Sequence, residues 1–207
     1  SCLVGSEMCI RDSYIILGVG FLSSIIGGGS AWYVTCHDFY GRKTLEWILI
    51  LPLTIPTYIA AYAYYDALEL LNPLFNWSRS QFGIKETMML ENFAIYLIVI
   101  ILFSFVLYPY IYLGVRASLL ISGNRLVESA ATLGLPSNKV FSKLILPFIK
   151  PAIIAGLSLV IMETLNDYAA VEYFGISTLT IGIFRSWFGM YDMASALKLS
   201  SYLILFT

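Results

Sequence analysis

Long runs without charged residues constrain this chain more than any other feature. The runs are Tyr14–Cys36, Trp47–Tyr65, Asn92–Val115 and Leu144–Met162, of which the last holds a single charge, Lys150. A helix needs about 20 mostly apolar residues to cross a bilayer, where no water is present to satisfy its backbone. These runs therefore predict four membrane-spanning helices. A further apolar run from Ala194 predicts part of a fifth.

The composition excludes the main alternatives to a membrane protein. Hydrophobic residues make up 59% of the 207 residues and charged residues 12%, against about 45–50% and 25% in soluble domains. The formal net charge of −1 gives no basic surface for a nucleic-acid backbone. We therefore expect neither a soluble globule nor a nucleic-acid binder. The predicted fold class is all-α, a polytopic transmembrane helical bundle with about five spans in this chain.

The two ends of the chain need separate treatment. Residues 1–13 (SCLVGSEMCIRDS) resemble a translated sequencing adapter and are expected to be an artefact. The last residues, SYLILFT, lie inside an apolar run, so we expect residues 14–207 to be a truncated transmembrane domain. The three cysteines and the single histidine show no metal-ligand spacing. No metal site and no catalytic residue are predicted.

Lysine and arginine placement predicts the orientation in the membrane, because cytoplasmic loops carry an excess of both. The predicted cytoplasmic loops hold Arg42, Lys43, Arg116, Arg125, Lys139, Lys143 and Lys150, and the opposite side holds Arg79, Lys85, Arg185 and Lys198. The loop after the first span and the long loop 116–150 should therefore lie together on the cytoplasmic side.

Glycine and proline mark special positions inside the spans. Pro52 and Pro56 lie four residues apart in the second run, and they predict a kink, which a membrane helix tolerates when neighbours satisfy the freed carbonyls. Gly27, Gly28 and Gly29 lie in the first run. Small residues allow helices to approach closely, so we favour packing over a pore for these glycines.

The long loop predicts two short helices lying along the membrane. Asn124 is a good cap for a helix RLVESAATL, and Gly134 is placed to end it. Ser137 is a good cap for a second helix, NKVFSKLIL, which should end at Pro147. An ordinary amphipathic connector would have the same geometry, so this pattern alone leaves both interpretations open.

The spacing within this loop resembles a known motif. Glu128, Ser129 and Ala130 are followed by three residues, Gly134, nine residues, and then Leu144, Ile145, Leu146 and Pro147. The EAA loop of bacterial ABC importer permeases reads Glu-Ala-Ala, three residues, Gly, nine residues, an aliphatic residue, any residue, Leu-Pro. The resemblance implies that loop 117–147 is cytoplasmic and docks on an ATPase subunit. The implied ATPase-coupling residues are Glu128, Ser129, Ala130, Gly134, Leu144, Leu146 and Pro147.

The resemblance extends over residues 14–207. Segments such as GRKTLEWILILPLTIPTYIAAYAYYDAL and LYPYIYLGVRASLL are similar to ferric-iron ABC permeases of the MetI-like fold, in their amino-terminal half. Asn166-Asp167-Tyr168-Ala169 stands where that family has Ala-Asp-Phe-Gly. Thiamine, putrescine and phosphonate permeases share much of the scaffold and remain alternative substrate classes.

The resemblance also implies location and partners. It implies a multi-pass protein of the bacterial inner membrane, surrounded by lipid, that works with ABC ATPase subunits, a periplasmic substrate-binding protein and a second permease half. That second half would lie in the same full-length chain or in another copy. No cofactor is expected in this chain, because no G-x-x-x-x-G-K-[ST] motif is present and ATP would bind the partner subunit.

Acidic and phenolic side chains near the outer end of the fourth span are candidates for the translocation path or outer gate. Glu163 and Asp167 lie four residues apart, and Tyr168 and Tyr173 follow. Ionisable groups in a membrane helix usually face a cavity or the protein interior. The alternative is that these residues form a helix end in hydrated headgroups. Arg185 and Trp187 fall in a segment where the family has a short outer helix and a loop that dock the binding protein, and a solvated interface helix would explain the same residues.

Two other functional classes fit a polytopic chain less well. A membrane enzyme would need a catalytic constellation at membrane depth, and the sequence has one histidine and no aspartate pair within a span. A channel or secondary transporter would not need the loop spacing, and the inverted repeats typical of many secondary transporters are not visible in the sequence.

Overall fold

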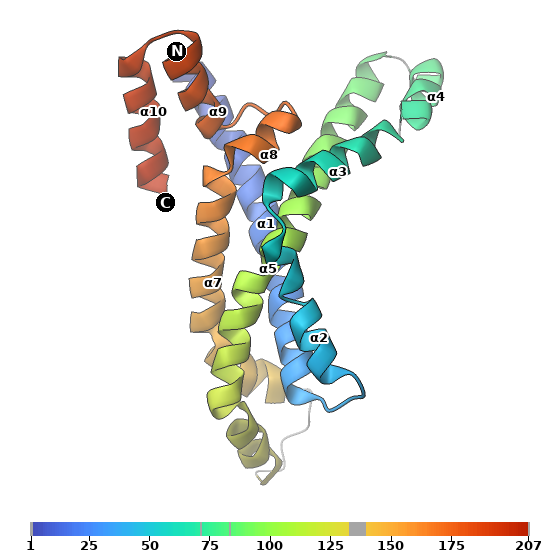
Figure 1. The fold of residues 1–207 in the computed structure, drawn as a ribbon, viewed down its shortest axis with the longest axis vertical. Coiled ribbons are helices and arrows are strands. Elements are labelled where there is room, and N and C mark those ends of the chain that lie inside the picture. Colours follow the sequence, from blue (N-terminus) through green and yellow to red (C-terminus); the bar gives the residue numbers. More distant parts are fainter. Residues whose placement is uncertain (1, 71, 83, 133–139, 207) are drawn as a thin grey trace. The chain divides into compact units, whose positions relative to one another are not determined.

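The computed structural model describes residues 2–70, 72–82, 84–132 and 140–206, and these form helices and no strands. In chain order they are α1 (Cys2–Cys36), α2 (Arg42–Ile48), the 3₁₀ helix η1 (Leu51–Thr54), α3 (Thr57–Glu69), α4 (Asn72–Phe82), α5 (Ile84–Thr132), the π-helix η2 (Phe141–Ile145), α7 (Leu146–Asn166), α8 (Tyr168–Tyr173), α9 (Leu179–Phe184), the π-helix η3 (Arg185–Gly189) and α10 (Met193–Phe206). Figure 1 shows these elements along the chain. The prediction of an all-α fold is confirmed.

Three helical stretches are long and apolar enough to cross a membrane: Glu7–Cys36, Met88–Ile121 and Lys143–Asn166. They contain the first, third and fourth of the predicted runs, which confirms those three. A fourth span results if the broken pair Arg42–Thr54 and Thr57–Asp66 crosses the membrane as one unit. The described residues thus give three or four candidate spans where the sequence predicted about five.

Prolines break the second predicted span instead of kinking it. Pro52 lies in η1, and Pro56 lies between η1 and α3, with its carbonyl accepting hydrogen bonds from Ile59 N (3.0 Å) and Ala60 N (3.3 Å). Proline has no N–H to donate, and it pushes the residue before it out of the helical region. Two prolines four residues apart leave no complete helical turn between them. The prediction of a continuous, kinked helix is therefore wrong.

Helix boundaries in the long loop also differ from the sequence prediction. α5 continues through Asn124 to Thr132, so the separate helix expected to begin there is wrong. A capping side chain matters only where backbone donors lack an acceptor in the preceding turn, and an unbroken helix supplies that acceptor. The second predicted helix does not end at Pro147, because α7 begins at Leu146 and holds Pro147 in its first turn, where proline is tolerated. Gly134 and Ser137 lie outside the described residues.

The chain divides into two compact units. The first unit comprises Ser1–Val19, Ile55–Ser104 and Ile161–Thr207, and the second comprises Gly20–Thr54 and Phe105–Val160. Each unit therefore combines segments that are distant in the sequence. This division places the coupling segment and the acidic candidates in different units.

Glycines bring the helices of the second unit into backbone contact. A Cβ atom added to Gly27 of α1 would lie 2.7 Å from the carbonyl oxygen of Tyr108 in α5, and one added to Gly156 of α7 would lie 2.8 Å from Ile111 Cα. Ile111 and Tyr112 are fully buried at this junction. Nothing lies within 4 Å of a Cβ added to Gly29. The packing interpretation is therefore confirmed for Gly27 and not for Gly29.

Short helices pack against one another in the first unit. α3 contacts α8, and α9 contacts both η3 and α10. Thr178 caps α9 by accepting a hydrogen bond from Ile181 N at 3.4 Å, and Thr180 Oγ1 donates to the carbonyl oxygen of Leu165 at 3.0 Å. These bonds connect α9 to the end of α7 and fix the segment that follows the acidic candidates.

Residues 2–13, which resemble an adapter, form the first turns of α1 in the structure. Asp12 is buried and its carboxylate accepts a hydrogen bond from Leu179 N at 3.0 Å. The sequence had assigned Asp12 no role.

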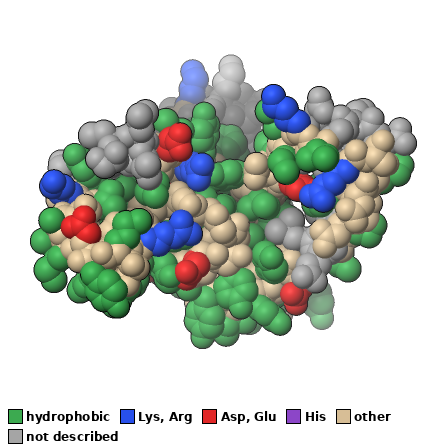
Figure 2. Space-filling model, turned by 90° about the horizontal axis from the view of Figure 1, so that it is seen from above, with side chains coloured by type: hydrophobic (Ala, Val, Ile, Leu, Met, Phe, Trp, Pro, Cys, Tyr) green, Lys and Arg blue, Asp and Glu red, His purple; other side chains and the backbone are tan. Residues whose placement is uncertain are grey.

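Exposed apolar side chains are abundant among the described residues. They include Leu17, Phe21, Ile121 and Ile204, each at least 70% exposed. On the face seen in Figure 2, hydrophobic side chains dominate and acidic and basic ones are scattered among them. Such surfaces suit contact with lipid or with further helices rather than with water.

Candidate functional site

The predicted coupling residues fall on three elements of the second unit. Glu128, Ser129 and Ala130 lie in the last turns of α5, and Gly134 lies outside the described residues. Leu144 lies in η2, and Leu146 and Pro147 begin α7. The motif therefore spans the end of one long helix and the start of the next. None of the sequence-predicted coupling roles is tested by these positions alone.

The second part of the motif presents an exposed apolar edge. Leu146 is 44% exposed, Phe148 is 37% exposed, and Pro147 is also exposed. Ile145 and Ile149 are almost fully buried and anchor the same segment to its unit. The π-turns of η2 precede this edge, a feature that is frequent at functional sites. The edge lies within the candidate span Lys143–Asn166, so its outward apolar groups suit contact with lipid as well as docking on another protein.

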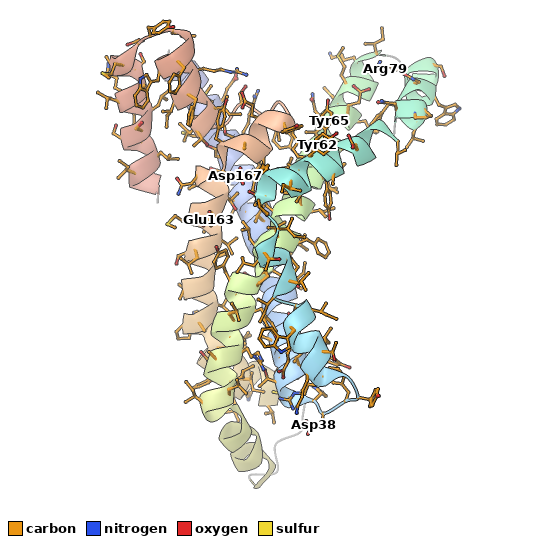
Figure 3. All side chains as sticks on the ribbon, in the orientation of Figure 1. Asp38, Tyr62, Tyr65, Arg79, Glu163 and Asp167 are labelled. Carbon is orange, nitrogen blue, oxygen red and sulfur yellow. The ribbon has the colours of Figure 1, made fainter. Side chains whose placement is uncertain are left out.

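The acidic candidates lie at the carboxyl end of α7 in the first unit, as Figure 3 shows for Glu163 and Asp167. Glu163 is exposed and its carbonyl accepts a hydrogen bond from Asp167 N at 3.1 Å. The Asp167 carboxylate accepts a hydrogen bond from Ala170 N at 2.9 Å and thereby caps α8. Glu163 is therefore the freer carboxylate, and Asp167 has a structural role that the sequence did not predict.

Tyrosines of α3 and α8 contact one another in the same unit. The Tyr173 ring meets Tyr62 and Tyr65 of α3 edge-on, with ring centroids 6.0 and 6.2 Å apart; Figure 3 labels both α3 tyrosines. The hydrogen bond to Glu172 is the main cause, and burial a lesser one, that raises the pKa of Tyr168 above its usual value. Tyr168 and Tyr173 thus lie on α8, in the same unit as the acidic candidates.

We expect Asp167→Ala to lower the stability of the complete permease by about 1 kcal/mol, the usual effect of losing a helix cap. Asp167→Ser keeps an oxygen that can accept from Ala170 N, so it should retain most of that stability. Thermal unfolding in detergent would measure the difference. Equal stability of the Ala and Ser variants would contradict the capping role.

The segment after α9 contains the predicted outer residues Arg185 and Trp187. Both lie in η3, where the Trp187 ring stacks on Phe188 with centroids 5.4 Å apart. Trp187 is 51% exposed. The hydrogen bonds from the Ser195 side chain and backbone hold the pKa of Asp192 below its usual value, which keeps this carboxylate ionised at the start of α10. The predicted short helix is confirmed.

Sequence reasoning missed an ion-pair network in the second unit. Arg116 Nη2 lies 2.6 Å from Glu46 Oε2, Arg42 Nε lies 3.3 Å from Glu46 Oε1, and Arg42 Nη1 lies 2.6 Å from Asp38 Oδ1. The network joins the α1–α2 loop and α2 to Arg116 within α5, and the shared cytoplasmic side of the two basic loops stays a prediction. The four-residue spacing of Asp38, Arg42 and Glu46 was a visible signal, whereas the partner Arg116 was not.

No group of three or more His, Cys, Asp or Glu side chains within the described ranges could hold a metal ion.

Residues 21–207 match the family model described as "Binding-protein-dependent transport system inner membrane component". The chain is 28% identical over 175 residues to the sulfate transport system permease protein CysT of Salmonella typhimurium, which covers 83% of this chain and 61% of that protein. It is 26% identical to the molybdenum transport system permease protein ModB of Haemophilus influenzae, over 70% of this chain and 60% of the relative. The Fe(3+)-transport system permease protein FbpB 2 of Haemophilus influenzae is 26% identical over 92% of this chain and 33% of its own length. The chain thus spans between a third and three fifths of these relatives.

Proposed function

The chain belongs to the family of binding-protein-dependent transport system inner membrane components, and we propose that it forms part of the permease of an ATP-driven importer for a small inorganic ion. The observation that carries this proposal is the family match over residues 21–207, which includes the EAA-like loop. Membership of a transport family favours import over the membrane-enzyme and secondary-transporter alternatives. ATP hydrolysis belongs, on this proposal, to separate ATPase subunits.

The coupling proposal rests on the exposed edge of the second unit. Leu146, Pro147 and Phe148 turn apolar surface outward while Ile145 and Ile149 hold the segment to its unit. An ATPase subunit that grips this edge would transmit its own closure to α5 and α7, the two long helices that the loop connects. Such a device needs contacts that differ between the inward-facing and outward-facing states.

Ferric iron is our first candidate substrate. Glu163 of α7 and Glu172 and Tyr173 of α8 are exposed carboxylate and phenolic side chains of the first unit. Oxygen ligands of this kind suit a highly charged cation and repel an oxyanion. The iron permease relative also aligns over 92% of this chain. High affinity is not required here, because a separate binding protein would deliver the ion.

Sulfate is the second candidate, and the comparisons favour it. The sulfate permease relative is 28% identical over 83% of this chain, and a molybdenum permease is among the other relatives. Thiamine, putrescine and phosphonate, which the scaffold alone left open, have no such support among these relatives.

Uptake by the complete importer decides between these ions. We expect proteoliposomes that hold the full-length permease and its ATPase subunits to accumulate ferric iron, given ATP and the matching binding protein. Sulfate and molybdate should not compete for that uptake. Accumulation of sulfate but not iron would overturn the first candidate and support the second. No ATP-dependent uptake of any of the three ions would overturn the proposal of inorganic-ion import.

A further inference from the structure

A groove of about 620 Å³ opens at one end of the second unit, between the α1–α2 loop, α2 and the last turns of the Met88–Ile121 span. Tyr40, Lys43, Arg116 and Leu120 are among the side chains that line it. The loop follows directly on the end of the Glu7–Cys36 span. The groove therefore lies where two candidate spans end.

The charges in this groove leave one cation unpaired. The acids that line it, Asp38 and Glu46, are both engaged by the guanidinium groups of Arg42 and Arg116. Lys43 is exposed and forms no ion pair with any residue that the structure describes. Arg116 Nε is buried and has no acceptor among the described residues. The lining thus carries three basic and two acidic side chains, and Lys43 is the one exposed lining cation that no described acid pairs, which calls for an anion.

Aromatic and apolar side chains are found among the lining residues and next to them in the sequence. Tyr40 and Leu120 line the groove, and Leu120 is 59% exposed. Ile121, 78% exposed, and Trp47, 75% exposed, directly follow lining residues in the sequence. The Tyr40 side chain is fully exposed. Tryptophan and tyrosine gather at the headgroup level of membranes, and exposed aliphatic side chains beside them suit acyl chains. A ligand with an anionic head and an apolar tail fits these surroundings.

We propose that this groove binds the phosphate group of an anionic phospholipid of the cytoplasmic leaflet, with Lys43 as the cationic donor. The excess of Lys and Arg in the adjoining loops places this end on the cytoplasmic side. Anionic lipids of that leaflet attract basic groups near the surface, and basic pockets between spans on this side bind lipid headgroups. The proposal goes beyond ion import, and it does not depend on which ion is carried.

Lipid binding by the complete importer, with its ATPase subunits attached, tests this site. The purified complex would be placed in phosphatidylcholine nanodiscs with and without phosphatidylglycerol. Native mass spectrometry would then count the phosphatidylglycerol molecules that stay bound to the complex. We expect Lys43→Gln to weaken phosphatidylglycerol binding about fivefold, the effect of one basic group near the surface. Lys43→Arg should restore binding, because it keeps the charge.

Lys85→Gln is the matched control, because Lys85 is also exposed and forms no ion pair with another described residue, but it lies in the first unit. Binding should be unchanged in this variant. An equal loss of phosphatidylglycerol binding in both variants would mean that only the net charge of the protein matters, and it would overturn the proposal. Competition by inorganic phosphate as strong as that by phosphatidylglycerol would assign the groove to free phosphate. No phosphatidylglycerol retained in the presence of the ATPase subunits would show that the protein partner covers the groove.

Discussion

Replacing Gly27 with valine should unfold the second unit of the permease at a markedly lower temperature than in the parent protein. A Cβ at this position would lie 2.7 Å from the Tyr108 carbonyl oxygen and 3.0 Å from Ile111 Cβ. The first of these atoms belongs to the backbone and cannot rotate away, so α1 and α5 must separate. Overpacking of this kind costs about 3 kcal/mol at the upper end of its usual range, which corresponds to a fall of roughly 6–12 °C in the unfolding midpoint.

Gly29→Val is the matched control for this prediction. Gly29 lies two residues further along the same helix, and nothing lies within 4 Å of a Cβ added there. Both variants carry the same branched side chain, so the difference between them isolates the helix contact from the intrinsic preference of valine. Thermal unfolding of the detergent-solubilised permease, read by intrinsic fluorescence, would measure it. Equal midpoints for the two variants would contradict the assigned packing of α1 on α5.

Much of the membrane architecture was predictable because it depends on local composition. Tyr14–Cys36, Asn92–Val115 and Leu144–Met162 each lie within a helix that is apolar enough to span a bilayer. The break at Pro52 and Pro56 was not foreseen in full, since a single proline kinks a membrane helix and only the pair leaves no turn intact. The predicted helix start at Asn124 was wrong for a related reason. A good capping residue does not interrupt a helix when the residues on both sides of it remain helical.

The candidate sites were predictable only where sequence spacing equals spatial proximity. Asp167 was grouped with Glu163 by their four-residue separation, and the two remain adjacent. That spacing could not show that the Asp167 carboxylate caps α8, because the cap depends on where α7 ends. The contact between Glu46 and Arg116 joins residues that are far apart in the sequence. A contact of this kind depends on how α2 packs beside α5, which no local pattern encodes.

Gly134 is the residue at which we expect the largest loss of function. It lies outside the described residues, and its role rests on the EAA-like spacing of Glu128, Gly134 and Pro147 together with the family match. On the proposed mechanism this loop enters a groove of the ATPase subunit, and glycine supplies a tight turn that leaves room for the partner. A tryptophan there should block docking without altering the spans.

Gly29→Trp is the control for this variant, because a Cβ added to Gly29 meets nothing within 4 Å and the residue lies in α1, outside the loop and outside the segment proposed to meet the binding protein. Membrane insertion and affinity for the substrate-loaded binding protein should be unchanged in both variants. These two measurements separate loss of coupling from loss of folding.

The rate of ATP hydrolysis by the complete reconstituted importer, with and without substrate-loaded binding protein, tests the central proposal that this chain is the permease of an ATP-driven importer. The parent and Gly29→Trp importers should be stimulated by the binding protein, and Gly134→Trp should lose that stimulation by about tenfold, the scale of a typical coupling energy. Full stimulation in the Gly134→Trp importer, with the protein inserted and folded, would contradict the account.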